Sequence, residues 1–210
     1  MRYIRKCATP QFFIDDTAGL TLWNDYLAQN KRKLKEFILV NEQNGLCCYC
    51  EGKIIINQSH LEHIKPKSMD ILNLTFDYNN ISVSCNGLCN NMEKEYCGHK
   101  KENGFDGIKF LNPLETANIR DYFVYENNGE IKSSGIDDVK SSYTINLLQL
   151  NTFNNYLQEA RQKALKEFRE VIIKNAKDTK KDLREIAFFL LNQENFAYIS
   201  FLRYQYKNIL

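Results

Sequence analysis

The chain lacks the segments that would direct it to a membrane or out of the cell. None of its apolar runs is long enough to span a bilayer, and residues 1–6 lead into no hydrophobic segment of signal-peptide type. We therefore expect a cytoplasmic protein with no membrane partner. Internal repeats, low-complexity tracts and flexible linkers are also missing, so the parts of the chain are expected to pack directly on one another.

A strong net charge is missing too. The sequence has 28 Lys and Arg residues against 26 Asp and Glu residues, which leaves a formal net charge of +2. No global field therefore attracts nucleic acid or a membrane surface. Any contact with nucleic acid must come from local patches, and we expect the isolated chain to bind it weakly, with a partner supplying much of the basic surface.

The cysteine pattern argues against a disulfide framework. The seven cysteines are an odd number, and six of them cluster at short spacings in a chain without an export signal. Metal ligation by thiolates fits this pattern better. The content of 43% hydrophobic residues, including 12% aromatic residues, is sufficient for a packed core.

The cysteines form two half-sites on either side of residues 59–67. Cys47 and Cys50 have Cys-x-x-Cys spacing, which is typical of a zinc knuckle. The second half-site begins at Cys85, and either Cys89 or Cys97 could complete it. Together the two half-sites predict one tetrahedral, structural zinc ion, whereas Cys7 and Cys48 are expected to be ordinary cysteines.

Between the half-sites lies the pair Glu62-His63. Hydrolysis of a phosphodiester with one metal ion needs a general base, a divalent cation and hard ligands for that cation. Adjacent side chains on a strand point to opposite faces, so a bent backbone or a ββα hairpin-and-helix unit is needed to bring both to one phosphate. A second ligand for Mg²⁺ could come from His99, Asn90 or Asn91. His60 could join the site or bind zinc, but a place at the surface or behind the ligands is the preferred interpretation. The lysines expected to meet phosphates are Lys65, Lys67, Lys100 and Lys101.

The local patterns predict an α+β protein. We expect a helix over residues 20–44, strands over 54–56 and 79–84, a hairpin over 120–134 with an Asn-Gly turn, and helical segments over 143–150, 153–176, 180–191 and 195–206. The Lys31–Lys35 run could grip phosphates, but a solvated helix face is the preferred interpretation. We divide the chain into an N-terminal helical extension (1–45), a zinc-stapled core (46–115) and a C-terminal hairpin and helical region (116–210).

In these residues the sequence resembles the HNH endonuclease family. The matching elements are Cys47 and Cys50, Glu62-His63-Ile64-Lys65-Pro66, Asn80-Ile81, Cys85, and Cys97-Gly98-His99-Lys100-Lys101. The resemblance implies a ββα-metal core in which His63 is the general base. Glu62 and His99 would then bind a catalytic Mg²⁺ or Mn²⁺, Asn80 would orient the loop around His63, and Cys47, Cys50, Cys85 and Cys97 would hold structural zinc.

Two departures from the family pattern leave an alternative open. Residues 86–96 stretch the second half-site, and Gly98 stands where the family has Asn or His. In a rival alignment Cys89 is the zinc thiolate and Asn90 the ligand of the catalytic metal. Cys97 is preferred because Lys100 and Lys101 follow it at the distance at which the family's Lys follows.

Most of the chain resembles, more narrowly, the HNH subunit of Septu-type antiviral systems, including those attached to retrons. The resemblance implies an ABC-type ATPase partner, and for a retron also a reverse transcriptase and its DNA–RNA product. The aromatic residues of the last helix could contact such a partner, although an intramolecular core is the preferred interpretation for them. They are Phe196, Tyr198, Phe201, Tyr204 and Tyr206.

Two functions of different classes follow from the sequence. The first is a metal-dependent endonuclease that acts in antiviral defence on DNA or on a structured RNA such as tRNA. The second is an inert, zinc-stapled module that binds nucleic acid or serves as an adaptor. Phosphate contacts and a metal do not by themselves indicate whether the substrate is DNA or RNA.

Overall fold

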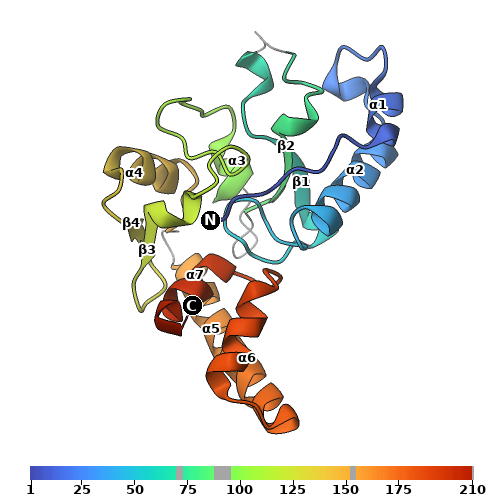
Figure 1. The fold of residues 1–210 in the computed structure, drawn as a ribbon. Coiled ribbons are helices and arrows are strands. Elements are labelled where there is room, and N and C mark those ends of the chain that lie inside the picture. Colours follow the sequence, from blue (N-terminus) through green and yellow to red (C-terminus); the bar gives the residue numbers. More distant parts are fainter. Residues whose placement is uncertain (70–72, 88–95, 152–154, 210) are drawn as a thin grey trace.

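The computed structural model describes residues 1–69, 73–87, 96–151 and 155–209, and Figure 1 shows its fold. Helices and short two-stranded sheets are combined, so the α+β prediction is confirmed. The helices are α1 (Gln11–Thr17), α2 (Ala28–Asn41), α3 (Cys97–Lys101), α4 (Asp138–Leu147), α5 (Tyr156–Thr179), α6 (Leu183–Asn192) and α7 (Ile199–Gln205). The strands are β1 (Ser59–His63), β2 (Ile81–Cys85), β3 (Phe123–Tyr125) and β4 (Ile131–Ser133).

Strands β1 and β2 form an antiparallel pair that carries the residues singled out in the sequence. The register places Ser59 opposite Cys85 and His63 opposite Ile81. Helix α2 packs beside this pair (Figure 1), and its buried Leu34 joins Ile81 in a small hydrophobic cluster. Helix α3 contacts β2. One end of the pair thus holds Cys85, and the other holds His63.

The N-terminal helix is shorter than predicted. Helix α2 begins at Ala28, because the backbone is extended at Leu22 and again at Leu27, with a single 3₁₀ turn between them. This break allows Tyr26 to be buried against the ring of Phe13, with centroids 5.9 Å apart. Burial of two aromatic rings outweighs the helical propensity of the segment.

The strand predicted at residues 54–56 is wrong. An isolated bridge between Leu46 and Lys53 closes the cysteine knuckle, and a 3₁₀ turn covers Ile56–Gln58. The carbonyl of Ile56 accepts a hydrogen bond from Lys35 Nζ at 2.6 Å instead of pairing with a strand. The apolar run therefore forms a connection into β1.

A larger hydrophobic core joins the knuckle to the C-terminal helices. It contains Ile4 and Cys47 from the first part of the chain and Leu191 and Phe201 from the last. Polar contacts reinforce this union at Glu51, directly after Cys50. The Glu51 carboxylate accepts hydrogen bonds from the Ser200 backbone N–H at 2.9 Å and from its hydroxyl at 2.6 Å. Burial raises the pKa of Glu51. Nearby positive charges, including Arg120, and the Ser200 hydrogen bonds lower it by more than burial raises it, so the net pKa lies below the ordinary value.

The predicted hairpin is confirmed as β3 and β4, and one arginine attaches it to α5. Arg161 is 3% exposed and donates to the carbonyl of Gly129 at 2.7 Å and to that of Leu150 at 2.9 Å. Gly129 has φ +85°, and a Cβ there would lie 2.5 Å from the carbonyl oxygen of Gln158. The turn therefore requires glycine, both for its backbone conformation and for its close approach to α5.

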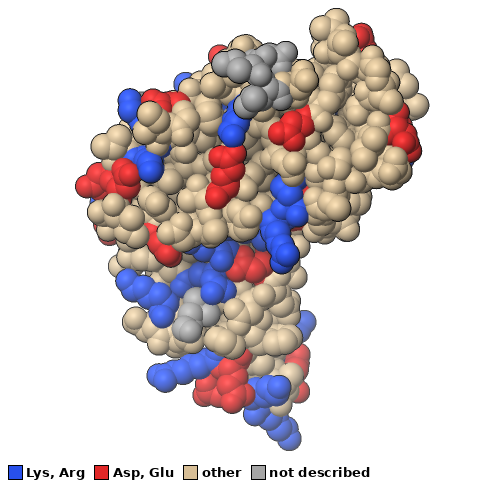
Figure 2. All heavy atoms as spheres, turned by 45° about the horizontal axis from the view of Figure 1, so that its top comes forward, with Lys and Arg blue, Asp and Glu red and all other residues tan. Residues whose placement is uncertain are grey.

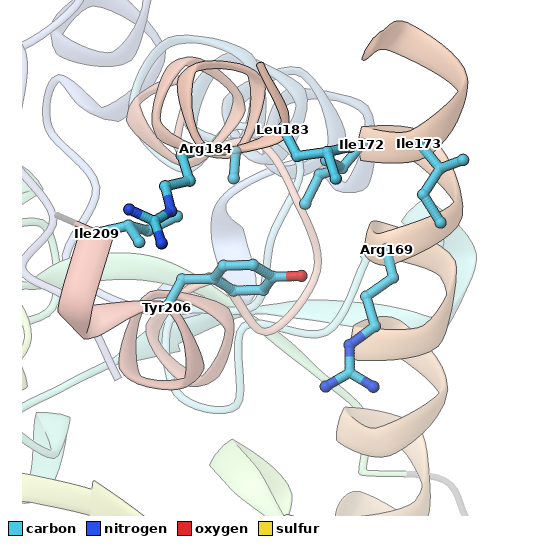
Figure 3. Close-up of a pocket in the computed structure, with 8 residues that line it drawn as sticks. Arg169, Ile172, Ile173, Leu183, Arg184, Tyr206 and Ile209 are labelled. Atoms are coloured by element: carbon cyan, nitrogen blue, oxygen red, sulfur yellow. The ribbon is translucent and has the colours of Figure 1, made fainter. Parts of the chain in front are cut away.

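The aromatic residues of the last helix belong to the core, as the preferred interpretation had it. Phe201 is fully buried and lies 5.5 Å, between ring centroids, from Tyr125. Beyond this core, a cavity of about 370 Å³ opens between α5, α6 and the end of the chain. Figure 3 shows Ile172 and Ile173 entering it from α5 and Tyr206 from the end of the chain.

Side chains of both charge signs lie on the surface. In Figure 2, basic and acidic side chains are interspersed over the visible face. Among the described residues, no helix is both long and apolar enough to cross a membrane.

Candidate metal centre and active-site cavity

Four thiols meet at one point in the structure. The Sγ atoms of Cys47, Cys50, Cys85 and Cys97 all lie within 4.8 Å of one another. Two of the separations, between Cys47 and Cys97 and between Cys50 and Cys85, are 3.8 Å. Zinc bonded to sulfur at about 2.3 Å in a tetrahedron places its sulfurs about 3.8 Å apart. The donor set and its spacing therefore fit a structural zinc ion.

The surrounding backbone orients these thiols. The N–H of Gly52 points to Cys50 Sγ and that of Cys85 to Cys47 Sγ, each at 3.4 Å. Such N–H groups favour thiolate, the form that binds metal. Cys97 enters the cluster with φ +61° at the start of α3.

The other two described cysteines, Cys7 and Cys48, do not belong to this group of four. Cys48 is buried beside it without belonging to the group of four, and Cys7 is exposed. The rival ligands Cys89 and Asn90, together with Asn91, lie outside the described residues.

Glu62 is a buried carboxylate at the end of β1. It is 6% exposed, and its Oε1 accepts hydrogen bonds from the Tyr49 hydroxyl at 2.9 Å and from Lys101 Nζ at 3.0 Å. Its Oε2 lies 3.0 Å from His60 Nε2. Burial raises the pKa of Glu62, but the His60 hydrogen bond and the Lys101 charge lower it by more, so the net pKa is below the ordinary value. The carboxylate is therefore ionised at neutral pH.

His60 and His99 form a stacked pair beside this carboxylate. Their ring centroids are 4.2 Å apart, and the planes differ by 13°. Asn86 Oδ1 lies 3.1 Å from His60 Nδ1 and fixes the orientation of that ring. The structure thus brings the predicted ligand residue His99 to the same cavity as Glu62 and places His60 between them in contact with both.

His63 lies on the other side of the same cavity in a different environment. Its Nε2 is 2.9 Å from the carbonyl oxygen of Thr75, and its ring meets Trp23 edge to face with centroids 4.5 Å apart. Burial lowers the pKa of His63 to about 4, and the charges of Lys67 and Lys101 act in the same direction. A carbonyl only accepts hydrogen bonds, so Nε2 carries the proton and Nδ1 of the neutral ring is a free base.

Asn80 holds the segment that follows His63. Its Oδ1 accepts from the Lys65 N–H at 2.8 Å, and its Nδ2 donates to the Lys65 carbonyl at 2.9 Å. The side chain is 4% exposed, so water does not compete for these bonds. The amide therefore fixes the backbone two residues after His63.

The predicted phosphate-binding lysines occupy three kinds of place. Lys100 is exposed, Lys65 is half-buried and pairs with Glu115 at 2.5 Å, and Lys67 is half-buried at the cavity. Lys101 is instead only 2% exposed, and its ammonium contacts Glu62 and the His63 carbonyl. The structure thus places Lys101 in the interior, where it balances the Glu62 charge, and of the other three it places Lys67 at the cavity.

Gly98 separates the cysteine cluster from the cavity. A Cβ at this position would lie 2.4 Å from Glu62 Oε2 and 2.6 Å from His60 Nε2. The departure from the family pattern at this position therefore has a steric cause. No side chain fits between the start of α3 and the carboxylate.

We expect Gly98→Ala to lower the activity of the site about tenfold to a hundredfold, because displacement of a positioned group by an ångström costs rate on that order. The matched control is Gly107→Ala, since Gly107 is exposed and a Cβ there meets nothing closer than 3.6 Å. Activity assays with equal amounts of folded protein measure the effect. Equal activities of the two variants would contradict the steric role of Gly98.

Sequence reasoning left open that His60 joins the site, and residues two apart on a strand share a face, as His60 and Glu62 do. It missed three other residues of the site. Tyr49, Trp23 and Thr75 carry no such signal, since tertiary packing alone brings them to the carboxylate and the imidazole.

The cavity joins these groups in one volume. It measures about 320 Å³ and is lined by residues 60–63 of β1 and by Lys67, Gly98 and His99, among others. It therefore presents an ionised carboxylate, two stacked imidazoles and a neutral histidine base to one bound molecule.

Comparison with known proteins agrees with this arrangement. No protein-family model matches the chain. A protein of Vibrio cholerae serotype O1 biovar El Tor, named "Retron Vc95 putative HNH endonuclease", is 32% identical over 184 residues, which are 83% of this chain and 84% of that protein. The chain belongs to the HNH endonuclease family. The alignment spans most of both chains.

Proposed function

We propose that the chain is a metal-dependent endonuclease that hydrolyses nucleic-acid phosphodiester bonds. The observation that carries this proposal is the cavity that a neutral His63 and an ionised Glu62 both line. Membership of the HNH endonuclease family supports the same reaction class.

In this proposal His63 is the general base. Its Nδ1 takes a proton from a water molecule, whose oxygen attacks the phosphorus as the bond from phosphorus to the leaving oxygen breaks. Nε2–H stays bonded to the Thr75 carbonyl. A histidine with a pKa of about 4 is almost fully deprotonated at pH 7, so the base form is always present. Asn80 keeps the segment after His63 in place during the reaction.

Glu62 and His99 would hold the catalytic Mg²⁺ or Mn²⁺, and His60 is placed to assist them. A carboxylate oxygen and an imidazole nitrogen, completed by water and substrate oxygens, form an accepted ligand set for these ions. When bound, such an ion neutralises charge on the scissile phosphate and its leaving oxygen. Tyr49 and Lys101 fix the Glu62 carboxylate so that Oε2 faces the cavity. Lys65, Lys67 and Lys100 would contact phosphates of the substrate.

The four cysteines would hold structural zinc, which joins the knuckle to β2 and α3. The name of the Vibrio cholerae relative places that protein in a retron. By extension we propose that this chain is the effector of a Septu-type, retron-associated antiviral system. Its partners would be an ABC-type ATPase and, in a retron, a reverse transcriptase with its DNA–RNA product.

One observation favours a second candidate function, an inert module that binds nucleic acid or serves as an adaptor. Both oxygens of Glu62 already have protein partners in Tyr49, Lys101 and His60. A carboxylate so satisfied could serve only to stabilise the fold. The two functions differ in whether His63 is needed for cleavage.

The deciding experiment is a cleavage assay with plasmid DNA, single-stranded DNA and total RNA. Wild type and a His63 variant are compared with and without Mg²⁺ or Mn²⁺, each alone and with the ATPase partner. Cleavage that requires both the divalent ion and His63 supports the endonuclease. No cleavage by zinc-loaded, folded protein under any of these conditions establishes the adaptor.

A further inference from the structure

A second cavity adjoins the one that contains His63. It measures about 300 Å³ and shares His60 and Leu61 with the active-site cavity. Its other walls come from Trp23 and from the start of α2. A molecule bound in the active-site cavity can therefore extend directly into this one.

The wall from α2 is basic. Lys31, Arg32 and Lys35 line the cavity from successive turns of the helix. They belong to the Lys31–Lys35 run for which the sequence favoured a plain solvated face. Lys35 is held by the carbonyls of Ile56 and Ser59, and Arg32 pairs with Glu36 at 2.9 Å, but both remain part of the lining.

Trp23 stands where the two cavities meet. Lys31 Nζ lies 5.2 Å from the Trp23 ring centroid, and Lys67 Nζ lies 5.4 Å from it. Burial, followed by the positive charge of Lys31, lowers the pKa of Lys67. The two ammonium groups are thus close enough to repel each other, and a phosphate between them would relieve that repulsion.

An indole between cationic side chains is the combination that proteins use for single-stranded nucleic acid. Aromatic rings stack on unpaired bases, while nearby Lys and Arg residues follow the phosphates. A paired base inside a duplex does not offer its face to a side chain. Trp23 is half-buried, and its ring centroid lies 4.5 Å from that of His63, so a base stacked on it would lie beside the reacting phosphate.

We propose that this second cavity binds an unpaired nucleotide next to the scissile phosphate, with its base on Trp23 and its phosphate between Lys31 and Lys67. The substrate class is then single-stranded DNA or RNA, or an unpaired loop of either. This proposal rests on the proposed endonuclease function, because only that function makes the neighbouring phosphate the one that is cleaved. Binding of the unpaired nucleotide is measurable without cleavage.

The chain supplies its own probe, because Trp23 is its one tryptophan. Zinc-loaded protein without Mg²⁺ or Mn²⁺ is titrated with single-stranded DNA, single-stranded RNA and the corresponding duplexes, and Trp fluorescence is recorded. We expect single strands to quench the fluorescence and to bind at least tenfold more tightly than duplexes. Comparison of the DNA and RNA titrations identifies the preferred sugar. Binding of duplex as tight as that of single strand, or binding without quenching, would overturn the proposal.

Two substitutions of Trp23 distinguish stacking on a base from packing within the protein. Trp23→Leu keeps an apolar side chain against Tyr26 but cannot stack, so we expect it to weaken binding of a labelled single strand about tenfold, whereas Trp23→Phe retains most of the affinity. Lys31→Ala should reduce the slope of log affinity against log salt by about 1, while the exposed Lys166→Ala leaves it unchanged. Melting temperature and zinc content confirm that each variant is folded.

The outcomes also distinguish this proposal from the proposed function. Quenching by single strands without cleavage would support the subsite and count against the nuclease. Cleavage that is equally efficient on duplex and on single strand, and that Trp23→Leu leaves unchanged, would reject the subsite and keep the nuclease.

Discussion

Replacing His63 by alanine is expected to lower metal-dependent cleavage by at least about a hundredfold, since a positioned general base contributes on the order of 10² to 10⁴ in rate. The expectation follows from the ring's environment. Trp23 and the surrounding core bury it, its pKa is about 4, and the Thr75 carbonyl fixes which nitrogen carries the proton. Initial cleavage rates at equal concentrations of folded enzyme measure the effect.

The control for this variant must exclude a loss of fold. Removal of the ring leaves a gap beside Trp23, so zinc content and melting temperature are measured, and His63→Gln is made as a second variant that fills more of the space. Both variants should keep their zinc and lose cleavage. A His63→Ala protein that still cleaves within a few-fold of wild type would remove His63 from the role of base.

Cys97→Ser is expected to abolish stable folding of the chain, because a structural zinc site contributes about 10–16 kcal/mol on metal binding. That is comparable to the entire stability of a typical domain, about 5–15 kcal/mol. Cys97 is fully buried at the centre of the larger core, next to the knuckle. Zinc content and thermal unfolding followed by circular dichroism measure the loss, and a strong chelator should reproduce it in the wild type.

Two matched substitutions make this test specific. Cys7→Ser changes an exposed thiol outside the group of four and should leave zinc and stability unchanged. Cys89→Ser changes the thiol of the rival alignment and is expected to keep its zinc. If Cys89→Ser lost the metal while Cys97→Ser retained it, the assignment of the fourth ligand would be reversed.

The parts of the fold that the sequence predicted are those in which local chemistry decides the structure. The Asn-Gly turn produced the hairpin at its expected place because Gly129 must have positive φ there. Helices α5 and α6 follow the apolar periodicity. The strand predicted from Ile54 to Ile56 failed because a side chain from α2, Lys35, binds the carbonyl that a ladder would have used. Such a contact has no local signature.

The candidate site also contains some residues whose positions the sequence predicted and others whose positions it did not. Cys47, Cys50, Glu62 and His63 were visible as short-range spacings, and the structure brings all four to the positions described. The interior position of Lys101 was not predictable, because a lysine becomes buried only where a carboxylate from another element meets it. The position of Trp23 beside His63 was equally unpredictable from the sequence, because the two residues are 40 positions apart in the chain.

The contact between Glu51 and Ser200 sets a limit on how the protein can be shortened. The carboxylate lies one residue after Cys50 and accepts hydrogen bonds from the backbone N–H and the hydroxyl of Ser200 in the first turn of α7. Ending the chain before α5 would strip those donors from a buried anion and expose the apolar underside of the knuckle. The segment that contains the family's motif therefore depends on the C-terminal helices for its fold in this protein. A shortened nuclease built on that segment would have to include these helices.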